Sequence, residues 1–161
     1  MSNKKIAIVP GSFDPITNGH VDIVKRAAEE YETVYLAVMI NESKKYLFDI
    51  EQRTEIAKSA VCDIPNVRVI SSEGMLWKLA QDLDADAIVK GYRDQRDFDY
   101  EIEMAKFNEA HCPKAKTVLL KADPELITLS STAVREMLQK GESIESFMPK
   151  SAAELVRSFY K

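Results

Sequence analysis

Residues that form disulfides, bind metals or span membranes are scarce in this sequence. Its 161 residues include only two cysteines, Cys62 and Cys112, and these show no paired metal or redox spacing. We expect both to be free thiols in a reducing cytoplasm. The longest apolar run, residues 34–40, is far too short to cross a bilayer, and no long apolar segment of the signal-peptide kind follows Met1. A cytoplasmic protein is therefore expected, not a secreted or membrane-spanning one.

The number of histidines and the net charge are also small. There are two histidines, and the pair His111-Cys112 has no partners at ligand spacing, so no metal site made by the protein alone is expected. The net charge of −4 gives no overall attraction to nucleic acid or to an anionic membrane. An anionic substrate would need a local cluster of positive charge. The length and the 45% share of hydrophobic residues predict a single globular domain over residues 1–161.

Short β-rich runs alternate with helical patterns, which predicts a parallel sheet built from βαβ units. The expected strands are residues 5–9, 33–40, 67–70, 87–89 and 117–120. The expected helices are residues 20–31, one beginning near 49, 76–83, 97–109, 133–139 and one after 149. Right-handed crossovers then give an α/β fold: a Rossmann-like, doubly wound, five-stranded parallel sheet with helices on both faces. The loops after strands one, two, four and five would gather at one edge.

The most informative stretch is P-G-S-F-D-P-I-T-N-G-H, residues 10–20, which joins the first expected strand to the first helix. This junction lies at the carboxyl end of a strand, where α/β proteins usually bind ligands. The free N–H groups and the positive dipole end of the first helical turn suit a phosphate. Ser12 and His20 supply polar groups at its two ends. Alone, Ser12 would be a turn-forming residue and His20 a solvated histidine at a helix start.

Cationic and hydroxyl side chains recur in three later loops. Lys44 and Lys45 follow the second strand, where a lysine pair is usually only solvated surface. In K-G-Y-R, residues 90–93, the glycine would let a nucleotide approach the backbone, and the arginine would meet phosphates as a planar fork. The alternative is that both cations simply pair with the aspartates that follow. The hydroxyls of S-S-T, residues 130–132, suit phosphates at a helix start, although plain N-capping explains most such triplets.

Residues 10–20 resemble the T/H-x-G-H signature of the nucleotidylyltransferase superfamily, and most closely its phosphopantetheine adenylyltransferase branch. The similarity extends to S-K-K at 43–45, D-F-D-Y-E at 97–101 and the two loops just named. It implies reversible transfer of AMP from ATP to 4′-phosphopantetheine, which gives dephospho-coenzyme A and pyrophosphate in coenzyme A biosynthesis. It also implies Mg²⁺ bound with the ATP, a cytoplasmic homohexamer, and coenzyme A as a feedback ligand.

The resemblance also assigns roles to individual residues. His20 would donate a hydrogen bond to the α-phosphate, and Lys44 would contact the transferred and accepting phosphates. The expected catalytic residues are His20, Lys44, Ser12 and Arg93. The expected ATP-binding residues are Ser12, Phe13, His20, Gly91, Tyr92, Arg93, Glu101, Leu126, Ile127, Thr128, Leu129, Ser130, Ser131 and Thr132. The residues expected to bind the acceptor are Ser12, Lys44, Leu76 and Lys90.

Three features depart from the usual pattern of the family, and one of them is D-Q-R at residues 94–96, which is more charged than the small or apolar residues usual there. Lys90 stands where the family commonly has Arg, so the charge is kept but the bidentate fork is lost. Leu126 stands where many members have Trp near the adenine. We expect altered substrate affinity from the changes at Lys90 and Leu126. Two alternatives stay open: a nucleotidylyltransferase of the same fold that acts on nicotinamide mononucleotide or a cytidylyl acceptor, and a non-catalytic nucleotide-binding regulator. Thr17 argues weakly against the first, because those branches usually place His there.

Overall fold

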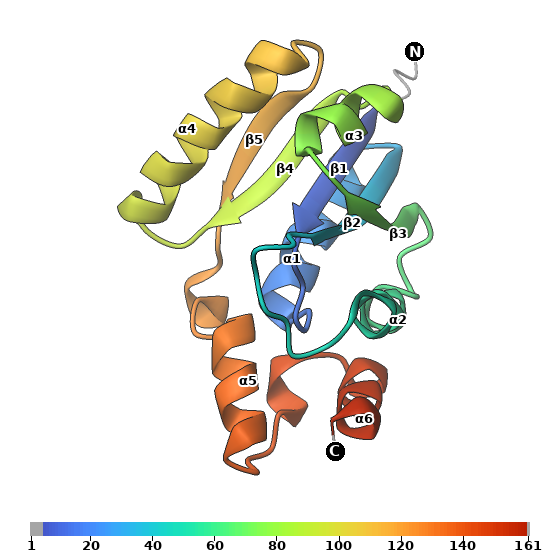
Figure 1. Cartoon of the computed structure of the whole chain (residues 1–161), viewed down its shortest axis with the longest axis vertical. Helices are drawn as coiled ribbons and strands as arrows, with labels where there is room; N and C mark the ends of the chain where they lie inside the picture. Colours follow the sequence, from blue (N-terminus) through green and yellow to red (C-terminus); the bar gives the residue numbers. More distant parts are fainter. Residues whose placement is uncertain (1–4, 161) are drawn as a thin grey trace.

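A computed structural model describes residues 5–160 and contains one five-stranded sheet with helices on both faces (Figure 1). The strands are β1 (Ile6–Gly11), β2 (Thr33–Ile40), β3 (Val67–Glu73), β4 (Ala87–Tyr92) and β5 (Lys116–Lys121). Their order in the sheet is β3-β2-β1-β4-β5, and all four neighbouring pairs are parallel. The order reverses direction between β1 and β4, where the carboxyl ends of parallel strands leave a crevice. The predicted doubly wound α/β fold is confirmed.

Six α-helices connect and flank the strands. They are α1 (Asn18–Glu30), α2 (Ile50–Ala60), α3 (Leu76–Asp82), α4 (Gln95–His111), α5 (Ser131–Gln139) and α6 (Lys150–Phe159). Two 3-10 turns, η1 (Pro124–Leu126) and η2 (Glu145–Phe147), were not predicted, because a three-residue turn carries no hydrophobic period. The predicted start of α2 is confirmed, since Asp49 caps it and its carboxylate accepts from the N–H of Gln52 at 2.8 Å.

Each face of the sheet has its own apolar core. In β1 the side chains of Ala7 and Val9 belong to the core under α1 and α2, whereas Ile8 belongs to the core under α3. All three are buried, which explains why this strand reads as a continuous apolar run. Figure 1 shows α4 running beside β4 and β5, on the same side as α3.

Helices α5 and α6 lie at the end of the molecule opposite the N-terminus (Figure 1). Val134 and Leu138 of α5 join the core of α1 and α2, as do Ala152 and Val156 of α6. This packing brings the start of α5 close to the loop after β1, although well over a hundred residues separate them in sequence. Within residues 5–160, none of the helices has the length and apolar character needed to span a membrane.

Candidate active site

A cavity of about 410 Å³ opens at the carboxyl ends of β1 and β4. The starts of α1 and α5 both border it, as do the segments that follow β4 and β5. Of the residues predicted to act in the site, those that line the cavity are Phe13, His20, Lys90, Gly91, Tyr92, Arg93, Glu101, Leu126, Ile127, Leu129, Ser130, Ser131 and Thr132. Ser12, Lys44, Leu76 and Thr128 are not among its lining residues.

The loop after β1 is shaped by a close contact between Gly11 and Phe13. A Cβ atom on Gly11 would lie 2.8 Å from the Phe13 ring, so only glycine leaves room for the ring there. Phe13 is buried and has a positive φ of 49°, which turns the chain sharply. Its ring meets the imidazole of His20 edge-on, with 5.1 Å between centroids. The turn therefore builds the wall against which His20 rests.

The orientation of His20 is fixed by the first turn of α1. The backbone N–H of Thr17 donates a hydrogen bond to Nδ1 of His20 at 3.0 Å, in a capping-box arrangement. Because Nδ1 accepts this bond, the ring proton of the neutral imidazole must lie on Nε2. The side chain of His20 thus closes the start of the helix and offers one N–H donor to the cavity.

The pKa of His20 is lowered from 6.5 to about 4. Burial is the main cause, because it disfavours the charged imidazolium, and the positive charge of Arg93 acts in the same direction. The partial positive charge at the start of α1 opposes protonation as well. At pH 7 this histidine is therefore a neutral hydrogen-bond donor and not a cation.

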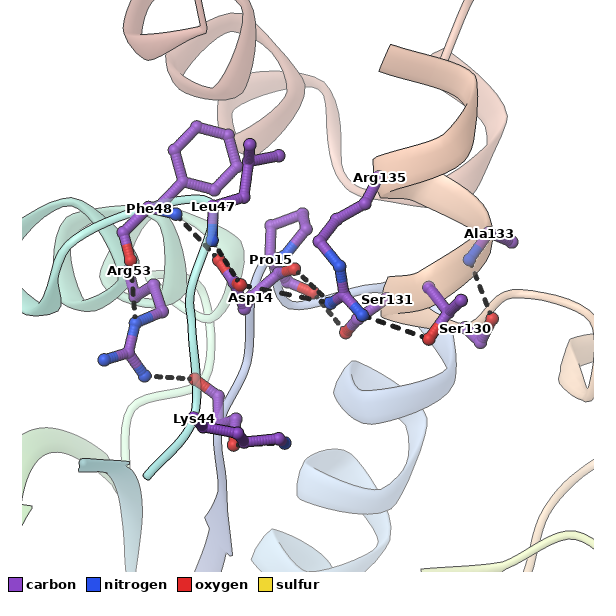
Figure 2. A network of polar contacts seen from close by, with 12 residues as sticks. Asp14, Pro15, Lys44, Leu47, Phe48, Arg53, Ser130, Ser131, Ala133 and Arg135 are labelled. Atoms are coloured by element: carbon purple, nitrogen blue, oxygen red, sulfur yellow. Dashed lines mark hydrogen bonds and ion pairs between the residues drawn. The ribbon is translucent and has the colours of Figure 1, made fainter. Parts of the chain in front are cut away.

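Lys44 and Ser12 form a polar pair beside the cavity. Nζ of Lys44 donates to Oγ of Ser12 at 3.3 Å, which brings together the loops after β1 and β2. The buried carboxylate of Asp14 supports the same junction, since it accepts from the N–H groups of Leu47 and Phe48 at 2.8 and 3.0 Å (Figure 2). The predicted meeting of these loops at one edge of the sheet is thereby confirmed.

Lys90 lies within β4 near its carboxyl end and Arg93 directly follows the strand, and both pair with acidic residues in the cavity wall. Nζ of Lys90 lies 2.7 Å from Oε1 of Glu101, and Nε of Arg93 lies 3.0 Å from Oδ2 of Asp97. Partial burial opposes ionisation of Asp97, but the hydrogen bonds and charge of Arg93 outweigh it and lower the pKa of that carboxyl. The predicted alternative of pairing with the following aspartates therefore holds for Arg93, whereas Lys90 pairs with a glutamate on α4 instead. Both ion pairs still face the cavity, where a phosphate could compete for the cations.

Hydroxyl groups at the start of α5 bind protein atoms. Oγ of Ser130 accepts from the N–H of Ala133 at 3.0 Å, so the N-cap alternative is confirmed for this residue. Oγ of Ser131 donates to the carbonyl of Pro15 at 2.7 Å, and Arg135 donates to the carbonyl of Asp14 at 2.8 Å (Figure 2). These bonds tie α5 to the loop after β1, so that two helix starts border one cavity.

Comparison with known proteins matches this architecture. A profile described as cytidylyltransferase-like covers residues 8–137. A protein of Caldanaerobacter subterraneus subsp. tengcongensis named phosphopantetheine adenylyltransferase is 41% identical over 157 residues, which are 98% of each chain. A protein of the same name from Lactobacillus acidophilus is 43% identical over 153 residues, 94% of this chain and 95% of that one.

The chain belongs to the phosphopantetheine adenylyltransferase family. The resemblance inferred from residues 10–20 is thus confirmed. A solved structure from Vibrio parahaemolyticus, provisionally named a nicotinate-nucleotide adenylyltransferase, superimposes with a TM-score of 0.70 and covers 96% of this chain. Its sequence is only 20% identical, so it shows that the fold is shared and nothing more.

Two residues predicted to bind the substrates of a phosphopantetheine adenylyltransferase, Leu76 and Thr128, do not line this cavity. Leu76 begins α3 and packs with the core on the opposite face from α1. Thr128 lies within the segment between Leu126 and Leu129, whose carbonyl oxygens face Gly19. A Cβ on Gly19 would come within 3.4 Å of the Leu126 carbonyl, so this glycine lets the segment lie against the start of α1.

Three charged residues that connect the loops and helices around the cavity were not predicted from the sequence: Asp14, Arg53 and Arg135. Asp14 lies inside the opening motif, but its partners are 33 and 34 residues away. Arg53 and Arg135 fall on amphipathic helices, where a charged residue is usually taken as solvated. Arg53 is only 1% exposed, and its hydrogen-bond partners are backbone carbonyls. Because every residue has a backbone carbonyl, the sequence gives no sign of this burial.

Gly91 is predicted only to admit a nucleotide, but in the structure it also leaves room for the side chain of Ile23 of α1.

Proposed function

We propose that this protein transfers an adenylyl group from ATP to 4′-phosphopantetheine, giving dephospho-coenzyme A and pyrophosphate. The observation that carries the proposal is the cavity in which the neutral His20 donor, two cations and two helix starts converge. Such a site suits several phosphates at once. Relatives that bear the name of this activity are 41–43% identical over nearly the whole chain, which supports the same choice.

The chemistry needs no nucleophile from the protein. A phosphate oxygen of the acceptor forms a bond to the α-phosphorus of ATP, and the bond from that phosphorus to the bridging oxygen of the β-phosphate breaks. Pyrophosphate leaves with the electron pair of the broken bond. The acceptor phosphate is already an anion at neutral pH, so the protein must mainly hold the two substrates in line and stabilise negative charge.

Each polar group of the site has a role in this proposal. His20 donates its Nε2–H to the α-phosphate, while Lys44, held beside Ser12, contacts the transferred and accepting phosphates. Lys90 binds the phosphate of the acceptor, and its ion pair with Glu101 weakens when it does so. Arg93 and the N–H groups at the start of α5 take the outer phosphates of ATP. These assignments give a role to each cation in or beside the cavity of a protein whose net charge is −4.

Mg²⁺ would be carried by the nucleotide. Among residues 5–160, no three or more His, Cys, Asp and Glu side chains come together as a metal site. The two carboxylates that line the cavity, Asp97 and Glu101, each face a cation. This donor set suits an ion that takes its ligands chiefly from phosphate oxygens and water, as Mg²⁺ does in many nucleotide sites. When bound, the ion would neutralise charge on the phosphates.

We also propose a homohexamer in the cytoplasm, with coenzyme A as a feedback ligand. Support for self-association comes from the outer side of α4, where Tyr100, Met104 and Phe107 are exposed by 64%, 38% and 42%. Their spacing places them on one stripe of the helix. Coenzyme A contains both the pantetheine arm and the adenosine of the two substrates, so it should compete for the same cavity.

Pyrophosphate release by the purified protein with Mg²⁺, ATP and 4′-phosphopantetheine tests the activity. The control reactions replace the acceptor with nicotinamide mononucleotide, or ATP with CTP. We expect release only with ATP and phosphopantetheine. Release with another pair would favour a different nucleotidylyltransferase. ATP binding without release from any pair would favour the non-catalytic regulator and make Lys90 and Leu126 the first positions to revert to Arg and Trp.

A further inference from the structure

Arg53 of α2 is a buried arginine whose guanidinium is bound by backbone carbonyls. Its side chain is 1% exposed. Nε donates to the carbonyl of Phe48 at 3.1 Å, and Nη1 donates to the carbonyls of Ser12 and Met39 at 2.8 and 3.1 Å. These acceptors lie at the entry to α2, in the loop after β1 and near the end of β2. One side chain therefore joins three segments that surround the cationic edge of the site.

The ring of Tyr46 connects the same guanidinium to Lys44. Cζ of Arg53 lies 3.8 Å from the centroid of this ring, and Nζ of Lys44 lies 5.9 Å from it. The Tyr46 hydroxyl accepts from the N–H of Asn41 at 2.9 Å, which fixes the beginning of the loop. Nζ of Lys44 also donates to Oγ of Ser12, and the carbonyl of Ser12 accepts from Arg53. Lys44 and Arg53 are labelled in Figure 2. Both neighbours of the Lys44 ammonium are thus held by Arg53.

Burying this cation is costly, so its retention calls for a physical reason. Arg53 takes part in none of the ion pairs found among residues 5–160. Burial lowers the pKa of its guanidinium and outweighs the nearby charges of Asp14 and Asp49, which act in the opposite direction. A planar guanidinium directs several donors at fixed angles and can reach three carbonyls together. A lysine ammonium has the same charge on one atom and cannot span that distance. The geometry, and not the charge alone, is what this position requires.

We propose that Arg53 is a positioning residue for adenylyl transfer, which holds the ammonium of Lys44 in place through Ser12 and Tyr46. The inference rests on the proposed function, since it assigns Lys44 to the reacting phosphates. Misplacement of a reacting group by about 1 Å can cost about a hundredfold in rate. Loss of the planar guanidinium of Arg53 should therefore lower kcat more than it raises KM for either substrate.

The test is a double-mutant cycle of Arg53→Lys with Lys44→Ala, read by kcat and KM for pyrophosphate release. In the wild-type background we expect Arg53→Lys to lower kcat by about 10- to 100-fold. In the Lys44→Ala background the same change should alter kcat less than about twofold, because the group it positions is gone. Equal effects in both backgrounds would overturn the proposal. If Arg53→Lys does not fold, Tyr46→Leu replaces it, with the same dependence on Lys44 expected.

Ile56→Val is the matched control for a purely structural effect. Ile56 is fully buried on α2, three residues after Arg53, and contacts neither loop through a polar group. It should lower the melting temperature and leave kcat and KM unchanged. Hydrogen exchange at residues 41–48 provides a readout that needs no activity: it should speed up in Arg53→Lys and not in Ile56→Val. A wild-type protein without activity would refute the proposed function, whereas unchanged exchange would refute the positioning role.

Discussion

At the scale of single residues, His20 has two separate tasks on its two ring nitrogens. Nδ1 accepts from the backbone of Thr17 and completes the first turn of α1, while Nε2 remains for a ligand. The group that we propose to stabilise charge is therefore aligned by the helix on which it lies. Preorganised donors of this kind are effective because they do not have to reorient as charge develops.

Replacement of His20 by Ala should lower kcat by about 10²–10³, the usual cost of losing one preorganised donor. Steady-state pyrophosphate release measures the effect, and circular dichroism checks the fold. The control is His111→Ala, which removes the other histidine. That ring stacks on Trp77 at 4.9 Å, away from the cavity, and its loss should leave turnover unchanged. Near-normal turnover in His20→Ala would exclude the role.

The low pKa of His20 leads to a prediction about pH. Between pH 4 and 6.5 the unfolded chain binds a proton at this residue that the folded chain does not, because the pKa is about 4 when folded and 6.5 when unfolded. Its contribution to the free energy of unfolding is complete above pH 6.5. That contribution should fall on acidification, by up to about 1.4 kcal/mol per pH unit.

Urea unfolding of the wild type and of His20→Gln between pH 4.5 and 7.5 measures this contribution. Glutamine can keep the capping-box bond at this position but does not titrate. The stability difference between the two proteins should shrink as the pH falls, and curves that stay parallel would contradict the assigned pKa. Turnover of the wild type should show no titration of His20 above about pH 5.

The sequence predicted which residues line the cavity better than it predicted the residues that they contact. His20, Arg93 and the hydroxyls of residues 130–132 are local features of motifs, and all line the cavity. The contacts of Lys90 with Glu101 and of Arg53 with Met39 join residues on different elements. Such contacts follow from how the helices pack on the sheet. No local pattern of residues encodes them.

At the scale of elements, the start of α5 combines helix capping with a proposed phosphate contact. Two different substitutions of Ser130 can distinguish these roles. Ser130→Ala should lower stability by about 1 kcal/mol, because the N–H of Ala133 loses its acceptor. Ser130→Asp should keep the cap but raise KM for ATP at least about tenfold, since its charge repels the phosphates. Urea unfolding and initial rates measure the two effects.

The control for these variants is Ser151→Ala on α6, far from the cavity. Its hydroxyl donates to the carbonyl of Ser59 and caps nothing in the site. We expect almost no change in KM. If KM for ATP is the same in Ser130→Asp and in the wild type, the start of α5 does not bind the phosphates of ATP.

Strand boundaries at the site show why element ends were harder to predict than the elements themselves. The run 87–89 was expected to end at Lys90, but β4 continues to Tyr92, which pairs with Lys121 of β5. The glycine at position 91 weakens any local strand signal. The register with β5 extends the strand nonetheless, because a neighbouring strand offers hydrogen bonds that composition does not reveal. The extension carries Gly91 and Tyr92 to the cavity wall.

At the scale of the whole molecule, the exposed stripe on α4 predicts an oligomer. Phe107→Glu places a charge in the proposed contact and should reduce the mass in solution toward that of a single chain. Size-exclusion chromatography with light scattering measures it. The control is Lys58→Glu, an exposed change on α2, on the opposite face of the sheet. A wild-type protein that is already monomeric would refute the hexamer.

The bonds between α5 and the first loop also have a consequence for how the chain is made on the ribosome. Arg135 follows Asp14 by 121 residues, and Ser131 follows Pro15 by 116. At about 5–20 residues per second, roughly 6 to 24 s pass between the synthesis of the loop and of the helix that fastens it. During that interval the nascent chain already carries His20 but has only one of the two helix starts. A newborn chain should therefore acquire nucleotide binding late and in a single step, after Arg135 has left the exit tunnel.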